Sequence, residues 1–278
     1  MPGGWRCGRF VLSLSRPLVM GVLNVTPDSF SDGGLHADPA RAIDAARRMV
    51  DEGADIIDIG AESTRPGAEP VSPDREWARL EPVLDGLRDL GRPLSVDTRR
   101  AEVMRRALAA GVDIVNDIEG FADPASVAAF AAGGAGAVIM HMRGEPQTMQ
   151  QDPVYRDVVA QVRQFLGTRA ENLIQSGVDA SRICVDPGFG FGKTLEHNVA
   201  LLARLDALAG LGFPVLAGVS RKSMIGQLTG RPPGERLVGS VAAALVAVAN
   251  GASVVRVHDV ASTVDALAVW NAVRRVRG

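Results

Sequence analysis

Eight short apolar runs recur along the chain, and a helix-like stretch follows each of them. The runs are rich in valine, isoleucine and leucine on both faces, which is typical of strands buried in a parallel sheet. They cover residues 18–24, 55–60, 93–97, 113–116, 135–141, 182–186, 214–218 and 253–258. Eight strand–helix units favour a closed (β/α)8 TIM barrel, and an open, doubly wound sheet is the alternative.

The helix-like stretches carry apolar residues three and four positions apart, as the buried face of a helix requires. They cover residues 39–52, 74–90, 99–110, 124–132, 154–176, 195–209, 234–250 and 261–276. Glycines suited to a left-handed helix end follow several of them: Gly53, Gly91, Gly111, Gly177 and Gly251. Residues 5–16 precede the first strand, and we expect them to form a short N-terminal hairpin or a plug across the barrel bottom.

The length of 278 residues fits one domain over residues 1–278, with the barrel at about 17–276. A net charge of −2 gives no reason to expect a nucleic-acid or membrane partner. The two cysteines, Cys7 and Cys184, exclude a disulfide scaffold and a zinc cluster built on thiolates. No apolar stretch approaches the ~20 residues of a membrane span, and no signal-peptide core is complete. We therefore expect a cytoplasmic protein.

Polar residues stand at the carboxyl ends of the predicted strands, where a parallel barrel builds its active site. They include Asn24, Asp97, Asn116, Asp117, His141, Asp186, Ser220, Lys222, Arg256 and His258. Helix capping explains two or three such residues, and Thr98 before residues 99–110 is one example. Capping does not explain a polar group at every strand end, so we expect a functional site at the barrel mouth.

The predicted mouth carries both signs of charge. The cations that suit an anionic ligand are Arg65, Lys222, Arg256 and His258. Asp97, Asn116 and Asp186 offer acceptors and donors to a polar heterocycle with amide and amino groups. An ion pair with Lys222 is the alternative interpretation of Asp186.

The glycine-rich segment at residues 186–194 comes close to two phosphate-binding motifs and matches neither. A P-loop requires glycine where Pro187 stands, and a dinucleotide fingerprint requires glycine where Lys193 stands. We expect these glycines to let the loop and Phe191 approach a flat ligand. An ordinary strand–helix turn is the alternative.

Two long loops, residues 26–38 and 61–73, begin at strand ends and are candidate lids, with inert surface loops as the alternative. The four histidines show no metal-ligand spacing, which argues against a histidine–cysteine metal site. A hard cation held mainly by a substrate phosphate would leave little trace in a sequence.

The same residues belong to motifs that closely resemble dihydropteroate synthase. The matching motifs are residues 20–34, 58–67, 95–98, 116–118, 140–150, 186–193, 218–223 and 256–260. They keep the family's order over about residues 17–270, and the first, sixth and last together are highly specific. The weakest match is residues 119–121, where the family often has a small residue in place of Glu119.

The resemblance implies a transferase of alkyl or aryl groups other than methyl. This enzyme would condense 6-hydroxymethyl-7,8-dihydropterin pyrophosphate with p-aminobenzoate, giving 7,8-dihydropteroate and pyrophosphate in folate biosynthesis. The resemblance also implies Mg²⁺ as cofactor and a homodimer.

By the same resemblance, the mouth holds three ligand groups. The dihydropterin would contact Asp97, Asn116, Ile118, Met140, Asp186, Lys222 and Arg256. Pyrophosphate would contact Asn24, Thr64, Arg65, Arg256 and His258, with Asn24 also on Mg²⁺. The p-aminobenzoate would contact Phe30, Thr64, Arg65, Pro66, Phe191, Lys222 and Ser223. The catalytic set would be Asp97, Lys222, Arg256 and His258.

The implied chemistry suits these residues. Cations and Mg²⁺ stabilise the charge that a departing pyrophosphate gains. Asp97 would stabilise a cationic methylene on the pterin by charge. An aryl amine is a free nucleophile at neutral pH, so the reaction needs no strong base. The helix after Ser223 would present N–H groups to the aminobenzoate carboxylate.

Two rival interpretations share part of this pattern. A pterin-binding barrel of the methyltetrahydrofolate–corrinoid methyltransferase type would keep Asp97, Asn116 and Asp186 but would not need the pyrophosphate residues. A non-catalytic paralogue would have lost Asn24, Lys222 or His258, and all three are present.

Overall fold

The computed structural model describes residues 4–26, 38–62, 71–145 and 148–277. Its parallel strands are β3 (Leu18–Asn24), β4 (Ile56–Gly60), β5 (Leu94–Asp97), β6 (Ile114–Asp117), β7 (Gly136–Met140), β8 (Ile183–Asp186), β9 (Leu216–Ala217) and β10 (Val254–Val257). They pair in the order β8-β7-β6-β5-β4-β3-β10-β9, and a parallel bridge between Val185 and Val215 joins the two ends. This closure confirms the (β/α)8 barrel and excludes the open sheet.

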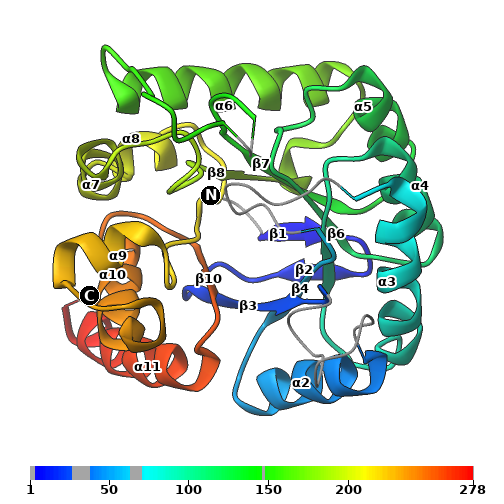
Figure 1. The fold of residues 1–278 in the computed structure, drawn as a ribbon, viewed down its shortest axis with the longest axis horizontal. Helices are drawn as coiled ribbons and strands as arrows, with labels where there is room; N and C mark the ends of the chain where they lie inside the picture. Colours follow the sequence, from blue (N-terminus) through cyan, green and yellow to red (C-terminus); the bar gives the residue numbers. More distant parts are fainter. Residues whose placement is uncertain (1–3, 27–37, 63–70, 146–147, 278) are drawn as a thin grey trace.

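Helices surround the barrel (Figure 1). They are α2 (Pro39–Asp51), α3 (Pro73–Gly86), α4 (Ala101–Ala109), α5 (Pro124–Ala131), α6 (Val158–Gln175), α7 (Leu195–Ala203), α8 (Asp206–Ala209), α9 (Ser223–Thr229), α10 (Leu237–Ala249) and α11 (Val260–Arg277). The helix expected after Ser223 is α9. No helix in the described ranges is long and apolar enough to cross a bilayer.

Several predicted helices differ from the structure in extent. The helix expected over residues 74–90 ends at Gly86, and the one expected over residues 234–250 begins at Leu237. The helix expected over residues 195–209 is divided into α7 and α8, because Arg204 leaves the helical region with φ −120° and ψ 35°. The helix expected from residue 154 begins at Val158, where the Asp157 side chain accepts a hydrogen bond from the Ala160 N–H and caps the first turn. The five glycines expected at helix ends all have positive φ, from +68° at Gly91 to +105° at Gly251.

The N-terminal hairpin closes the bottom of the barrel, as expected. Strands β1 (Trp5–Cys7) and β2 (Phe10–Leu12) pair antiparallel. Trp5 is fully buried, and its Nε1 donates a hydrogen bond to the Arg182 carbonyl at 3.0 Å. It belongs to an apolar cluster with the first residues of several barrel strands, among them Leu18 and Ile114. The apolar plug leaves the opposite, carboxyl-terminal end of the strands for the polar residues.

Candidate functional site

Strand register brings three of the predicted positions, together with Gly60, into one row at the mouth. Asn24 pairs with Gly60 across β3 and β4, Gly60 pairs with Asp97 across β4 and β5, and Asp97 pairs with Asn116 across β5 and β6. Paired residues of neighbouring strands lie about 4.8 Å apart. A polar side chain therefore stands on each side of Gly60, whose missing side chain leaves space between them.

A half-buried arginine links three of the strands. Arg256 Nε contacts Asp58 Oδ2 at 2.6 Å, and Arg256 Nη2 contacts Asp97 Oδ2 at 3.0 Å. Asn116 Nδ2 donates a hydrogen bond to the same Asp58 Oδ2 at 3.2 Å. The guanidinium thus holds two carboxylates that would repel each other without it.

Two buried oxygen atoms of this group have no protein partner. Within the described residues, Asp58 Oδ1 and Asn116 Oδ1 accept no hydrogen bond, although both are shielded from solvent. An unpaired buried acceptor costs about 1–3 kcal/mol. Two of them beside each other indicate a site for a ligand that carries N–H groups.

Asp58 is a site residue that the pattern of polar strand ends does not indicate, because it stands inside β4, where every residue is buried. A charged residue in the middle of an apolar strand is the signal that would have found it, because a buried charge requires a partner.

The opposite side of the mouth carries Asp186, Lys222 and Phe191. Asp186 ends β8 and pairs in register with Met140 of β7. Its Oδ1 accepts a hydrogen bond from the Gly188 N–H at 2.7 Å. Lys222 Nζ donates to the Phe189 carbonyl and lies 4.7 Å from the centre of the Phe191 ring. Met140 and Ile118 are buried, as expected of residues that line a flat pocket.

Burial perturbs the acid–base chemistry of these side chains. It raises the pKa of Asp97 to about 7, with Arg256 opposing the shift and Asp58 adding to it. It also raises the pKa of Asp186, where Lys222 opposes the shift. The pKa of Lys222 is lowered to about 8 by burial, against the attraction of Asp186. Perturbed groups gathered in one place are typical of a functional site.

His258 follows β10 and contacts Ser220, with its Nδ1 3.1 Å from the Ser220 hydroxyl. Burial, and then the charge of Arg256, lowers the pKa of His258 to about 4. The ring is therefore neutral at pH 7 and offers an N–H donor to an anion instead of a charge. Ser223 is exposed at the first position of α9.

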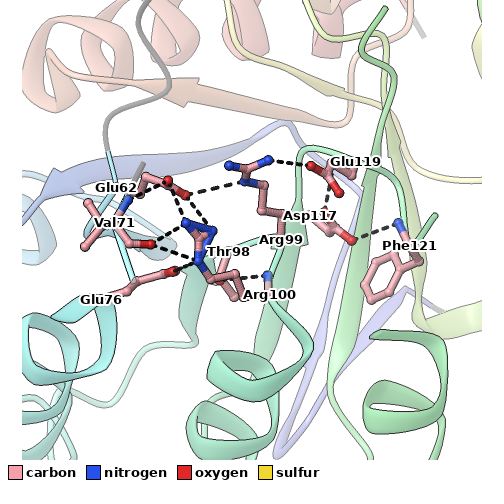
Figure 2. Close-up of polar contacts among 9 residues, drawn as sticks. All are labelled: Glu62, Val71, Glu76, Thr98, Arg99, Arg100, Asp117, Glu119 and Phe121. Atoms are coloured by element: carbon pink, nitrogen blue, oxygen red, sulfur yellow. Dashed lines mark hydrogen bonds and ion pairs between the residues drawn. The ribbon is translucent and has the colours of Figure 1, made fainter. Parts of the chain in front are cut away.

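An arginine joins the two stems of the β4–α3 loop (Figure 2). Arg100 contacts Glu62 at 2.9 Å on one stem, and its Nε donates to the Val71 carbonyl at 3.1 Å on the other. It also lies 3.3 Å from the fully buried Glu76. The Val71 N–H donates directly to Glu62 Oε1 at 3.2 Å. The stems are thus fixed to each other and to the residues that follow β5.

The weakest motif match belongs to the same ionic network. Glu119 contacts Arg99 at 2.7 Å, and Arg99 also lies 3.5 Å from Glu62. Asp117 accepts hydrogen bonds from the N–H groups of Glu119 and Phe121, both at 2.8 Å. Phe121 has a φ of +56°, so this turn depends on Asp117 to hold a left-handed residue. Figure 2 shows the turn beside the Arg99 side chain.

Four predicted site residues, Phe30, Thr64, Arg65 and Pro66, lie outside the described residues, as do most of the two candidate lids. Within the described residues no cluster of three or more histidine, cysteine, aspartate and glutamate side chains could hold a metal. Asn24 fits the weaker requirement of a single oxygen ligand. A Cβ built on Gly60 would lie 3.9 Å from both Asn24 Oδ1 and Asp97 Oδ2, so both oxygens face the space that Gly60 leaves open.

Known proteins share this fold and these motifs. Residues 20–258 match the family model described as pterin binding enzyme. The chain is 51% identical over 275 residues to the dihydropteroate synthase of Neisseria meningitidis serogroup B, covering 96% of each chain. The structure of Burkholderia cenocepacia dihydropteroate synthase complexed with 7,8-dihydropteroate superposes with a TM-score of 0.91 at 54% identity, covering 99% of this chain and 98% of that one. The Xanthomonas albilineans dihydropteroate synthase with 4-aminobenzoic acid has a TM-score of 0.91 at 50% identity, covering 96% and 97%.

The Arg100 network leads to a prediction about stability. Arg100→Met removes the cation that contacts the fully buried Glu76 and leaves Glu62 with Arg99 alone, so we expect a loss of roughly 3–5 kcal/mol in the free energy of unfolding. Urea denaturation followed by circular dichroism measures it. Arg106→Met is the matched control, because Arg106 also contacts two carboxylates, Asp74 and Glu102, but on the open surface. Its urea midpoint should hardly move, and equal losses in both variants would contradict the assignment.

Proposed function

This chain belongs to the dihydropteroate synthase family of pterin-binding enzymes, and we propose how the residues of its barrel mouth carry out the family's reaction. The reaction condenses 6-hydroxymethyl-7,8-dihydropterin pyrophosphate with p-aminobenzoate and yields 7,8-dihydropteroate and pyrophosphate. The observation that carries the proposal is the pair of buried acceptors without a protein partner among the described residues, Asp58 Oδ1 and Asn116 Oδ1. The same site holds Asp97 and Lys222, whose pKa values burial shifts.

The dihydropterin is assigned to this buried end of the mouth. Its ring N–H groups would donate to Asn116 and Asp186, and Lys222 would donate to a ring acceptor. Arg256 would stack on the ring while it keeps its contacts with Asp58 and Asp97. The buried Met140 and Ile118 would contact the ring's faces. Asp58 joins the set, since its Oδ2 holds Arg256 and Asn116 in place and its Oδ1 would accept a hydrogen bond from the ring's N–H groups.

The pyrophosphate is assigned to Arg256, His258, Asn24 and the residues Thr64 and Arg65 of the β4–α3 loop. Arg256 keeps its charge at any physiological pH, since the carboxylates of Asp58 and Asp97 raise its pKa against the effect of burial. His258 acts as a neutral donor in the free protein. Asn24 would share Mg²⁺ with pyrophosphate oxygens, and the ion would neutralise part of the charge on the leaving group.

The p-aminobenzoate is assigned to the outer part of the mouth. Phe191 offers a ring face for its aromatic ring, and Lys222 and Ser223 offer donors for its carboxylate. Phe30, Thr64, Arg65 and Pro66 of the two mouth loops would complete this site. The close approach of Lys222 to the Phe191 ring, at 4.7 Å, supports a shared boundary between the two substrates.

The chemistry proceeds by departure of pyrophosphate and then attack by the amine. The bond between the methylene carbon and the pyrophosphate oxygen breaks, and both electrons leave on the oxygen. Ionised Asp97 stabilises the positive charge that the methylene and the pterin ring share. The amine lone pair then forms the new carbon–nitrogen bond, and the nitrogen releases its extra proton to solvent.

We further propose that residues 1–278 form one domain, because the hairpin, the barrel and α11 share contiguous cores. A cytoplasmic location is proposed because Cys7 and Cys184 are both free and buried, which suits a reducing compartment.

A homodimer is proposed from the exposed faces of α10 and α11, which pack side by side (Figure 1). Val238 and Val246 lie eight residues apart on α10, and Val269 and Val273 lie four apart on α11, so each pair shares one helical face. All four valines are exposed, Val238 by 77%. A second copy of the same face would cover them symmetrically.

Pyrophosphate release tests the proposed reaction. With pterin pyrophosphate, p-aminobenzoate and Mg²⁺ present, we expect stoichiometric release of pyrophosphate and dihydropteroate, and chelation of Mg²⁺ should slow it. His258→Ala should slow release while the KM for p-aminobenzoate changes less than about threefold, and Phe191→Ala should do the reverse. If His258→Ala raised only that KM, His258 would belong to the second substrate.

The acid limb of the pH profile tests the role of Asp97. Only the ionised carboxylate stabilises a cation, so kcat/KM for pterin pyrophosphate should rise with pH and level off above about 7, the pKa of Asp97. Asp97→Asn should lower the rate and remove this limb. Asp117→Asn is the control, since burial also raises the pKa of Asp117 to about 7 but its carboxylate holds a turn. A limb that survives Asp97→Asn would refute the assignment.

The dimer has a separate test. Val238→Glu places a charge on the proposed interface and should convert the protein to a monomer in analytical ultracentrifugation at micromolar concentration. Val11→Glu is the matched control, because Val11 is exposed by 64% on the N-terminal hairpin. A wild-type monomer, or a dimer that persists in Val238→Glu, would remove this face from consideration.

A further inference from the structure

The loop between β8 and α7 is held at every carbonyl from residue 188 to residue 193. Each of these six carbonyls accepts a hydrogen bond from a side chain. Lys193 donates to two of the six, the carbonyls of Gly188 and Phe191. The carbonyls of Phe189 and Gly190 accept from Lys222 and Gln150, and those of Gly192 and Lys193 accept from Tyr155 and Asn198. Asn198 also donates, beyond the six, to the carbonyl of Thr194. Lys193 is therefore the donor that holds the Phe191 backbone to the rest of the loop.

Lys193 points into the protein and is only 3% exposed. Its Nζ lies 2.9 Å from the Gly188 carbonyl oxygen, 3.0 Å from the Phe191 carbonyl oxygen and 2.9 Å from His141 Nδ1. A fourth acceptor, the His141 carbonyl, is 3.3 Å away. Three close acceptors match the three protons of an ammonium group.

The His141 ring is suited to accept one of these protons. Burial, and then the charge of Lys193, lowers the pKa of His141 to about 3, so the ring is neutral at pH 7. Its Nδ1 then accepts from Lys193 and its Nε2 carries the proton. His141 also follows β7 directly, and its N–H donates to the Asp186 carbonyl at 3.0 Å. Lys193 thus ties the loop to the ends of β7 and β8.

In the described part of the chain no carboxylate makes an ion pair with Lys193, and all four of its acceptors are uncharged. Burial, and then the charge of Lys222, lowers the pKa of Lys193 well below its ordinary value, against the more distant attraction of Asp186. An apolar side chain of similar length would fill the same space. It would leave the Phe191 carbonyl and His141 Nδ1 without the donor that Lys193 supplies, and the Gly188 carbonyl with only the Phe191 N–H.

Glycines let the loop pack closely enough for these contacts. A Cβ on Gly188 would lie 2.0 Å from the His141 carbonyl oxygen, and one on Gly192 would lie 2.3 Å from the Arg143 carbonyl oxygen. Both glycines have positive φ, +66° and +62°. The backbone is therefore pressed against the segment after β7, and Phe191 stands between the two close approaches with its ring over Lys222.

We propose that Lys193 is a positioning residue that fixes the ring of Phe191 for the second substrate by binding the Phe191 and Gly188 carbonyls. This role rests on the proposed function, in which Phe191 contacts p-aminobenzoate. Lys193 is inside the protein and itself touches neither substrate. Its effect passes through the backbone of Phe191.

Steady-state kinetics of Lys193→Met test the proposal. We expect the KM for p-aminobenzoate to rise about tenfold while kcat falls less than about threefold, because a displaced binding surface weakens capture more than chemistry. Tyr155→Phe is the matched control. It removes the donor of the adjacent Gly192 carbonyl without touching Phe191, and its KM should stay within about twofold of wild type. A KM raised equally in both variants would indicate general loosening of the loop and overturn the proposal.

A double-mutant cycle with Phe191→Ala tests whether Lys193 acts through the Phe191 ring. If Lys193 acts through the Phe191 ring, Lys193→Met adds nothing to the KM of Phe191→Ala. Additive effects overturn the proposal. An unchanged KM in Phe191→Ala alone overturns the placement of Phe191 in the proposed function. If the KM rises in Phe191→Ala but is unchanged in Lys193→Met, only the role of Lys193 is overturned. Should Lys193→Met fail to fold, Lys193→Gln is assayed in its place, and the same outcomes decide.

Discussion

The mouth of this barrel depends on the ion pairs that the half-buried guanidinium of Arg256 makes. The guanidinium stands between Asp58 and Asp97, which come from neighbouring strands and could not both remain ionised in a buried site without a cation. Its own charge is secured by the same two carboxylates. Asp58 in turn accepts a hydrogen bond from Asn116, so an arginine on β10 sets the positions of groups from three other strands. The apolar plug at the other end of the barrel makes this possible, because it supplies a core that needs no polar residues.

The sequence predicted the barrel almost completely, and the reason is physical. Strands buried on both faces must be apolar, and the helices that cover them must carry apolar residues every three to four positions. Each parallel crossover combines one such strand with one such helix. Eight such units leave little alternative to closure. The extents of helices were less predictable, because the break at Arg204 and the late start at Val158 depend on local backbone angles and on one capping carboxylate. Neither leaves a periodic signal.

The polar residues at strand ends could also be predicted, since topology alone brings them to one mouth. The partners that these polar residues contact could not be predicted. Asp58 stands inside a strand, and nothing in its neighbourhood of the sequence indicates that Arg256, 198 positions away, will contact it. Glu119 departs from the resemblance at one position, yet the structure gives it a role in pairing with Arg99. Interactions between distant charges are determined by the closed barrel, and only the folded chain reveals them.

Arg256 and Lys193 are basic side chains in two different settings, and they differ in how much of their hydrogen-bonding capacity remains for a ligand. Arg256 is neutralised by carboxylates, so its remaining surface serves a ligand that enters from outside. Lys193 is surrounded by neutral carbonyls and a neutral imidazole, so its hydrogen-bonding capacity is used entirely within the protein. The first arrangement suits binding, because a ligand can compete for a charge at an open face. The second suits positioning, because every proton already has an acceptor and the loop that supplies those acceptors cannot move without losing them.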